Sequence, residues 1–200
     1  LPELPGRPTP ALRPEVELVA SPPFLTPKDV RPAIEALVEL IGQAKTSVRV
    51  QLLTYSPLAG RDGFWPVLDN ALRAAAVRGV RVRLMVSDWA LGSRALPHLR
   101  ALTLIPNLEV KVVSIPEAEE GHIPYARVIH SKYLVVDGTH LVLGTSNWEE
   151  SYFMDSRNVE LIFRDSPLAA QAVRIHDRLW ASRYAFPLDP SKTYEKRKVD

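Results

Sequence analysis

The sequence predicts an α/β fold in which a central, mostly buried mixed sheet lies between layers of helices in an α-β-α sandwich. Segments rich in β-branched and aromatic residues alternate along the chain with segments whose apolar residues recur at helical spacing. Apolar residues make up 46% of the 200 residues and charged residues 24%, which suits one globular domain with its own core. No internal repeat is visible, so each motif is present once.

The first half of the chain predicts a sheet that opens early and is interrupted by two helices. Thr26, Pro27 and Asp29 supply an N-cap, a proline at the first helical position and an early acid, and Gly42 marks the end of that helix. An alanine-rich amphipathic helix follows at 65–78. Alternating or β-branched segments predict strands at 15–20, 47–55 and 80–86.

The second half continues the alternation and contains one clear hairpin. Asp137 and Gly138 form a favoured two-residue turn, which joins a buried strand at 127–136 to a returning strand at 141–143. The other predicted elements, in chain order, are a helix at 93–104, a strand at 108–115, a polar loop at 117–121, a strand at 158–163 and a closing helix at 167–180.

Composition divides the chain into three parts. Eighteen prolines are present, and those in residues 1–14 predict a proline-rich leader or linker. Residues 15–186 carry the alternating elements and are expected to form a single domain. Residues 187–200 are a charged C-terminal tail, and its stretch from Lys192 to Lys198 is expected to be a solvated end.

Composition also limits the classes of protein. Lys and Arg number 25 and Asp and Glu 23, an excess too small to indicate a polyanionic partner by itself. The absence of cysteine excludes disulfides and thiolate metal sites, and leaves cytoplasmic and exported locations both open. No apolar run approaches the ~18 residues that a membrane span needs, so we expect no integral membrane segment.

One group of polar residues has the types and the spacing of a candidate catalytic site. His130, Lys132, Asp137, Gly144 and Asn147 follow the pattern HxKx4Dx6G(S/T)xN. Positions two apart on a strand project from the same face, about 6 to 7 Å from each other. The spacing therefore predicts that an imidazole and an ammonium point together into one pocket, where they can flank a small anion.

These residue types suit the cleavage of a phosphodiester. Lys132 and Asn147 can hold the non-bridging oxygens and absorb developing charge. The neutral imidazole of His130 can attack phosphorus and form a covalent intermediate, which divides one difficult displacement into two. A second group must protonate the leaving oxygen, and another imidazole suits that task, but this chain shows one motif only. Neither a metal nor a cofactor is needed for this chemistry.

Four further residues have both a functional and an ordinary structural interpretation. Asp137 could support the catalytic residues, but it sits on the opposite strand face from His130 and also suits a plain hairpin turn. Ser146 could bind phosphate or cap the backbone, and Glu160 could orient an imidazole or pair on the surface. Trp148 could stack on a nucleobase or cover an acyl chain, although core packing is the more common use of such a residue.

The motif resembles the HKD signature of the phospholipase D superfamily. That resemblance implies a phospholipase D-type sandwich in which two such motifs meet, within one chain or across a dimer. It also implies that His130 is the nucleophile or the acid/base, that Lys132 and Asn147 are phosphate ligands, and that Asp137 is a support residue. The second motif is then supplied by a severed upstream half, which we favour, or by an identical subunit.

A longer likeness points to one branch of that superfamily, the lysosomal 5′-exonucleases, whose second half this chain resembles. The branch implies a single-stranded nucleic acid as substrate, whereas the superfamily at large leaves a phospholipid headgroup as the alternative. A catalytically silent phosphate-binding half is a third possibility. Glu160 lies in a segment more similar to the general superfamily. The segments that carry the likeness are 20–23, 64–73, 80–87, 123–127, 144–148 and 180–184.

Overall fold

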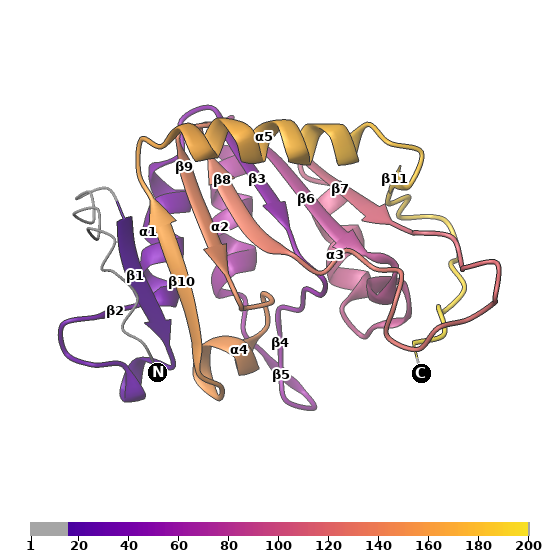
Figure 1. Ribbon diagram of the computed structural model, residues 1–200, viewed down its shortest axis with the longest axis horizontal. Coiled ribbons are helices and arrows are strands. Elements are labelled where there is room, and N and C mark those ends of the chain that lie inside the picture. The colour runs from indigo at the N-terminus through magenta and orange to yellow at the C-terminus, as the bar shows by residue number, and fades with distance from the viewer. Residues whose placement is uncertain (1–15, 200) are drawn as a thin grey trace, which may run out of the picture.

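The computed structural model describes residues 16–199, which form a nine-stranded sheet with helices on both faces (Figure 1). The strand order is β11-β7-β6-β3-β8-β9-β10-β1-β2, and a separate hairpin joins β4 to β5. Helices α1, α2 and α3 cover one face, and α5 crosses the other face near one end of the strands. No helix in this part of the chain is long and apolar enough to cross a membrane.

The elements agree with most of the predicted ones and add several short ones. The helices are α1 (Ala33–Gln43), α2 (Val67–Val77), α3 (Leu96–Thr103), α4 (Glu150–Met154) and α5 (Pro167–Trp180), with short 3-10 turns at Pro23–Leu25 and Asp88–Gly92. The strands are β1 (Val16–Ser21), β2 (Arg31–Pro32), β3 (Ser47–Gln51), β4 (Leu58–Ala59), β5 (Gly63–Phe64), β6 (Arg81–Ser87), β7 (Leu108–Val113), β8 (Lys132–Val136), β9 (His140–Gly144), β10 (Asn158–Phe163) and β11 (Ala185–Pro187).

The sheet is mixed, as predicted. Strands β3, β6 and β7 run parallel to one another, because α2 and α3 carry the chain back between them. Strands β8, β9, β10 and β1 continue the sheet in antiparallel order. Strand β8 lies at the junction of the two halves, between β3 and β9, so the segment that carries Lys132 has neighbours on both sides.

The two faces of the central strands are buried against different helices. Leu134 and Val136 of β8 pack into the main core with residues of α1 and α2. Tyr133 and Val135 alternate with them and contact the α5 side of the sheet, where Ala169 is fully buried. The alternation explains why this strand reads as a continuous apolar run, since both of its faces are covered.

Away from the end that α5 crosses, strands β9, β10 and β1 are covered on one face only. The side chains of Leu18, Leu143, Val159 and Leu161 are exposed by 48%, 42%, 47% and 38%. Leu18, Leu161 and Leu143 are direct cross-strand neighbours, so they share one face, which is the face that α5 crosses only near its far end (Figure 1). The expected mostly buried sheet is therefore found at its centre, whereas this outer face presents a row of apolar side chains, which we call the bare leucine face.

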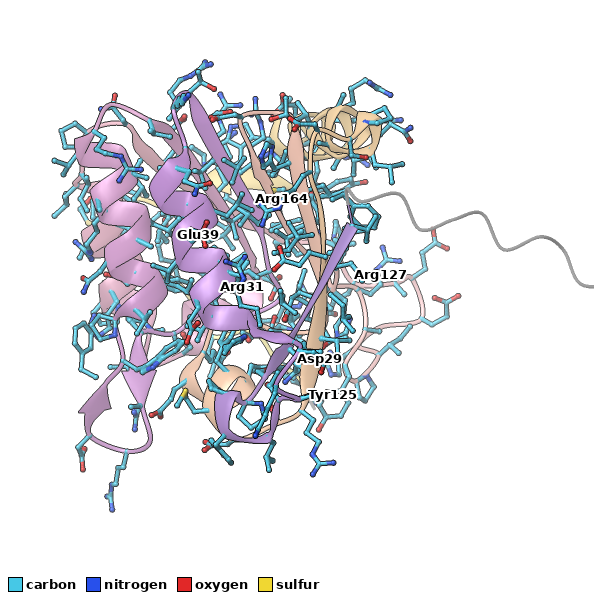
Figure 2. The ribbon with its side chains drawn as sticks, turned by 90° about the vertical axis from the view of Figure 1, so that its left-hand side faces the viewer. Asp29, Arg31, Glu39, Tyr125, Arg127 and Arg164 are labelled. Atoms are coloured by element: carbon cyan, nitrogen blue, oxygen red, sulfur yellow. The ribbon has the colours of Figure 1, made fainter. Side chains whose placement is uncertain are left out.

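The first helix begins later than its cap signals predicted. We expected it to start at Thr26, but α1 starts at Ala33. Pro32 disfavours the helical conformation of Arg31 before it, and both residues instead pair with β1. Arg31 forms ion pairs with Glu17 and Glu39, and Figure 2 shows Arg31 beside Glu39 at this edge of the sheet. Tertiary pairing has overridden a local helix signal.

The strand predicted at 127–136 is only half as long as expected. β8 begins at Lys132, because the ladder with β9 starts at the pair Lys132–Gly144 and the ladder with β3 ends at Tyr133. Tyr125 and Arg127 have φ angles of 56° and 59°, which bend the preceding chain away from a strand. Figure 2 shows this loop on the side of the sheet opposite α1 and α2.

The C-terminal tail is only partly solvated: most residues from Lys192 to Lys198 are exposed as expected, but Leu188 and Arg197 pack against the domain. Leu188 is 3% exposed, and its backbone N–H donates to the carbonyl of Val110 at 3.0 Å. The guanidinium of Arg197 lies 2.6 Å from the buried carboxylate of Asp88. Charge alone suggested solvation, but each of these groups finds a partner in the fold. The predicted leader, residues 1–14, lies outside the described residues.

Candidate active site

The head groups of His130 and Lys132 meet at the end of β8 that lies away from α5. The ammonium nitrogen of Lys132 is 3.3 Å from Nδ1 and 3.2 Å from Nε2 of the imidazole. An ammonium can only donate, so it can bond to whichever ring nitrogen carries no proton in the neutral imidazole. His130 is exposed and Lys132 is half-buried, so an anion from solvent can reach both groups.

Lys132 has no protein counter-ion among residues 16–199 at salt-bridge distance. Partial burial lowers the pKa of its ammonium, because the charged form loses hydration that no carboxylate replaces. A bound phosphate would provide the missing negative charge. The electrostatics of this lysine therefore favour an anionic ligand over an internal ion pair.

Gly144 opens the space beside Lys132. Lys132 pairs with Gly144 on β9, and Gly144 pairs with Glu160 on β10. Directly paired residues share a sheet face, so Lys132 and Glu160 flank a position that has no side chain, at a Cα separation of about 10 Å. A Cβ at Gly144 would lie 2.3 Å from Cγ of Glu160. The side chain of Glu160 thus lies across Gly144.

Glu160 and Ser146 form a buried pair next to this position. Each is 3% exposed, and the Ser146 hydroxyl donates to Oε1 of Glu160. Oε2 of Glu160 has no hydrogen-bond partner among the described residues. Burial raises the pKa of the carboxyl group, and the contacts with Ser146 oppose that shift without cancelling it. The pair borders a space of about 10 Å³ that Lys132 also lines, and Oε2 has the acceptor capacity to orient an imidazole.

Asn147 is fixed at both ends of its amide. Its Oδ1 accepts the backbone N–H of Thr54 at 3.2 Å, and its Nδ2 donates to the hydroxyl of Tyr152 at 3.1 Å. The residue is 1% exposed, and the amide retains one further N–H with which to bind an oxygen. Its placement is fixed by these contacts with Thr54 and Tyr152.

Asp137 does not join the site, which corrects its expected catalytic role. It follows the opposite end of β8, five residues from Lys132, or about 16 Å along a strand. Its carboxylate accepts the backbone N–H groups of Lys45, Thr46 and Ser47 at 2.8 to 3.3 Å. Partial burial tends to raise the pKa of Asp137, but these hydrogen bonds outweigh it and lower the pKa. The residue anchors the loop that enters β3.

Trp148 also departs from the substrate-binding role considered for it. It is 5% exposed and belongs to the main core, where Tyr55 forms a parallel bridge with it. The backbone N–H of Ser56 donates to its carbonyl at 2.9 Å. A nucleobase could stack on this ring only if the core opened. Core packing, the ordinary structural interpretation, therefore describes the position of Trp148.

Sequence reasoning missed Gln51. This residue is 3% exposed, and its Nε2 lies 2.5 Å from the hydroxyl of Ser131, the residue between His130 and Lys132. No motif or spacing marks it. Its proximity depends on the register of β3 against β8, which is a tertiary property.

The fold and the site together define a class of protein. The structure is a mixed α/β sandwich that presents a histidine, a lysine and an asparagine at one end of neighbouring strands, and this donor set can hold a small anion. The sequence model described as "Cardiolipin synthase, PLD-like domain" matches residues 37–180. The chain belongs to the phospholipase D family.

Curated relatives share roughly a third of their aligned residues with this chain. "Phospholipase D Z" of Dictyostelium discoideum is 36% identical over 180 residues, which cover 87% of this chain and 42% of the relative. "5'-3' exonuclease PLD4" of Homo sapiens is 38% identical over 189 residues, which cover 85% of this chain and 37% of the relative. The chain spans about two fifths of the length of these relatives.

Solved structures share the fold. NucT from Helicobacter pylori superimposes with a TM-score of 0.67 at 21% identity, over 87% of this chain and 100% of that one. Nuc from Salmonella typhimurium, described as a phospholipase D family member, gives 0.63 at 22% identity, over 86% and 97%. Both likenesses identify the α/β sandwich as the phospholipase D fold.

Proposed function

We propose that this chain is one half of a metal-independent phosphodiesterase that acts through a phosphohistidine intermediate. The observation that carries the proposal is the contact of the Lys132 ammonium with both ring nitrogens of His130, at 3.2 and 3.3 Å, where solvent reaches them. An unprotonated imidazole is a nucleophile, and an ammonium beside it can hold the anion that is attacked.

The proposed reaction has two balanced steps. A ring nitrogen of His130 attacks phosphorus, the bond from phosphorus to the leaving alcohol oxygen breaks, and that oxygen takes a proton from a second imidazolium. Water then gives a proton to the second imidazole and attacks the phosphohistidine, which releases His130. Lys132 and the free N–H of Asn147 stabilise the charge on the non-bridging oxygens in both steps.

The second imidazole must come from a partner, which we take to be another HKD lobe. The bare leucine face supports such a partner, since a row of exposed apolar side chains on a sheet is typical of an interaction surface. Val159 and Leu161 of this face flank Glu160 in β10 but point to the opposite side of the sheet, so a lobe docked there would lie across β10 from Glu160. An upstream half of a longer chain suits the length of the relatives, and an identical subunit satisfies the same chemistry.

Single-stranded nucleic acid is the proposed substrate. A relative named as a 5'-3' exonuclease supports it. Cleavage of a phospholipid headgroup is the second candidate, because another relative is named as a phospholipase D.

Turnover by the purified protein, with its molecular mass measured by light scattering, tests this proposal. A labelled single-stranded oligonucleotide and phosphatidylcholine vesicles are offered side by side, and we expect cleavage of the oligonucleotide by a dimer or by the chain joined to its upstream half. His130→Ala should abolish cleavage. His140→Ala, at the other end of the sheet, is the matched control and should retain it.

Three outcomes would contradict the proposal. Turnover at the wild-type rate by His130→Ala would exclude the phosphohistidine. Loss of activity in EDTA that a divalent ion restores would exclude metal-independent chemistry. Binding of phosphate without cleavage, by an assembly that contains two motifs, would indicate a catalytically silent half.

A further inference from the structure

A buried amide holds the backbone between the two motif residues. Nε2 of Gln51 donates to the Ser131 hydroxyl at 2.5 Å and lies 3.4 Å from the Ser131 carbonyl oxygen. Oε1 of Gln51 accepts the hydroxyl of Tyr133 at 3.0 Å. The carbonyl of Ser131 can only accept, so the nitrogen end of the amide must face it, and the orientation of the amide is defined.

We call the hydrogen bonds of Gln51 with Ser131 and Tyr133 the clamp. It lies where the pairing of β8 with β3 ends. Gln51 and Tyr133 are the last pair in the ladder between β3 and β8, and β8 itself begins at Lys132. Ser131 and His130 lie beyond the end of β8, and both are exposed. Beyond the end of this ladder, the side chain of Gln51 on the neighbouring strand holds Ser131 by hydrogen bonds.

The far end of the clamp is rigid. Tyr133 is 8% exposed and meets the ring of His176 edge-on at 6.3 Å, and His176 stacks on Trp180 at 5.5 Å. The three rings pack between β8 and α5. Contacts therefore run without interruption from α5 through Tyr133 and Gln51 to Ser131.

We propose that Gln51 is a positioning residue that fixes the imidazole of His130 for attack, an inference that rests on the nucleophilic role proposed above. Lys132 and Asn147 are held by other contacts, namely the β8–β9 ladder for Lys132 and Thr54 and Tyr152 for Asn147. The clamp thus controls the orientation of the nucleophile and leaves the binding of the phosphate largely unchanged. Misplacement of a reacting group by about 1 Å can cost roughly 100-fold in rate.

Two variants remove the clamp from opposite sides. Gln51→Met keeps the length of the side chain and removes both hydrogen bonds, and Ser131→Ala removes the shorter one at an exposed position. Each should lower kcat by roughly 10- to 100-fold with KM nearly unchanged. Ser131→Thr keeps the hydroxyl and should restore kcat. The double variant should be no slower than Gln51→Met, since both changes break one contact.

Ser47→Ala is the matched control. Ser47 is a buried serine on the same strand, 7% exposed, but it lies at the Asp137 end and its hydroxyl contacts Arg49. It should lower stability without lowering kcat. If Gln51→Met and Ser131→Ala keep the wild-type kcat, if KM rises as much as kcat falls, or if the two losses multiply in the double variant, the positioning role is wrong.

A second measurement separates this inference from the proposed function. Backbone ¹⁵N relaxation reports the order of His130 and Ser131 without any turnover. The wild-type amides should be as ordered as those of β8, and both clamp variants should make them more mobile, whereas Ser47→Ala should not. If the wild-type assembly cleaves no phosphodiester but this pattern holds, the proposed function fails and the clamp stands. If the order of His130 is the same in all variants, the clamp fails.

Discussion

Gly144→Ala tests whether the missing side chain at this position is what allows Glu160 to lie beside Lys132. The added Cβ would sit 2.3 Å from Cγ of Glu160, whereas ordinary contact begins at 3.4 Å. The carboxylate side chain must retreat by more than 1 Å, which breaks its contact with Ser146. Overpacking and the loss of a charged hydrogen bond together predict a loss of roughly 2 to 4 kcal/mol in the free energy of unfolding.

Urea unfolding followed by circular dichroism measures that loss, with the slope of the transition as a check on two-state behaviour. Gly42→Ala is the control, because a Cβ there meets nothing within 4 Å in α1. It should raise stability by about 0.5 to 1 kcal/mol. In a Glu160→Ala background, Gly144→Ala should cost less than about 1 kcal/mol. An equal cost in both backgrounds would refute the steric argument.

Three further outcomes follow from buried or anchored groups. Asp137→Ala should lower the free energy of unfolding by roughly 1 to 3 kcal/mol, because it removes the acceptor for the backbone N–H groups of the loop before β3. It should leave kcat unchanged. A large fall in kcat at saturating substrate, with the protein fully folded, would show that Asp137 acts in catalysis. Burial lowers the pKa of His176 from 6.5 to about 4, so the stability that neutral His176 contributes is present above pH 6.5 and is lost as the pH falls toward 4, by about 3 kcal/mol. His176→Phe should flatten that dependence in unfolding measurements, and an unchanged slope would contradict it. Burial raises the pKa of Glu160, so its contribution is present below pH 4.5 and is lost as the pH rises through the raised pKa; Glu160→Gln should remove the loss, and identical pH profiles of the two proteins would exclude it.

The sequence predicted the local elements well where one signal dominated. The strand at 158–163 and the helix at 167–180 were placed at the residues where β10 and α5 lie. Prediction failed where two signals competed. Thr26 and Pro27 look like a helix start, but the pairing of Arg31 and Pro32 with β1 delays α1 to Ala33. Cap residues act over one turn, and a strand partner distant in sequence can outweigh them.

The contact of His130 with Lys132 was predicted from strand parity, although His130 itself lies outside β8. The two head groups still meet, because the lysine side chain is long enough to reach the ring. Trp148 and Asp137 could not be assigned in this way. Their neighbours, Tyr55 and the loop 45–47, are remote in sequence. Only the packed structure therefore shows that Trp148 belongs to the core and that Asp137 anchors the loop before β3.

By itself the sequence determined the alternating architecture, the family signature and the choice of His130, Lys132 and Asn147 as the residues of interest. These properties follow from residue types at short fixed spacings, and a strand or turn expresses such spacings locally. Only the tertiary structure decided which strands pair and in which register. The space over Gly144, the clamp from Gln51, the bare leucine face and the packing of the tail all depend on that arrangement. Register and coverage depend on contacts between segments far apart in the chain, and local sequence does not encode those distances.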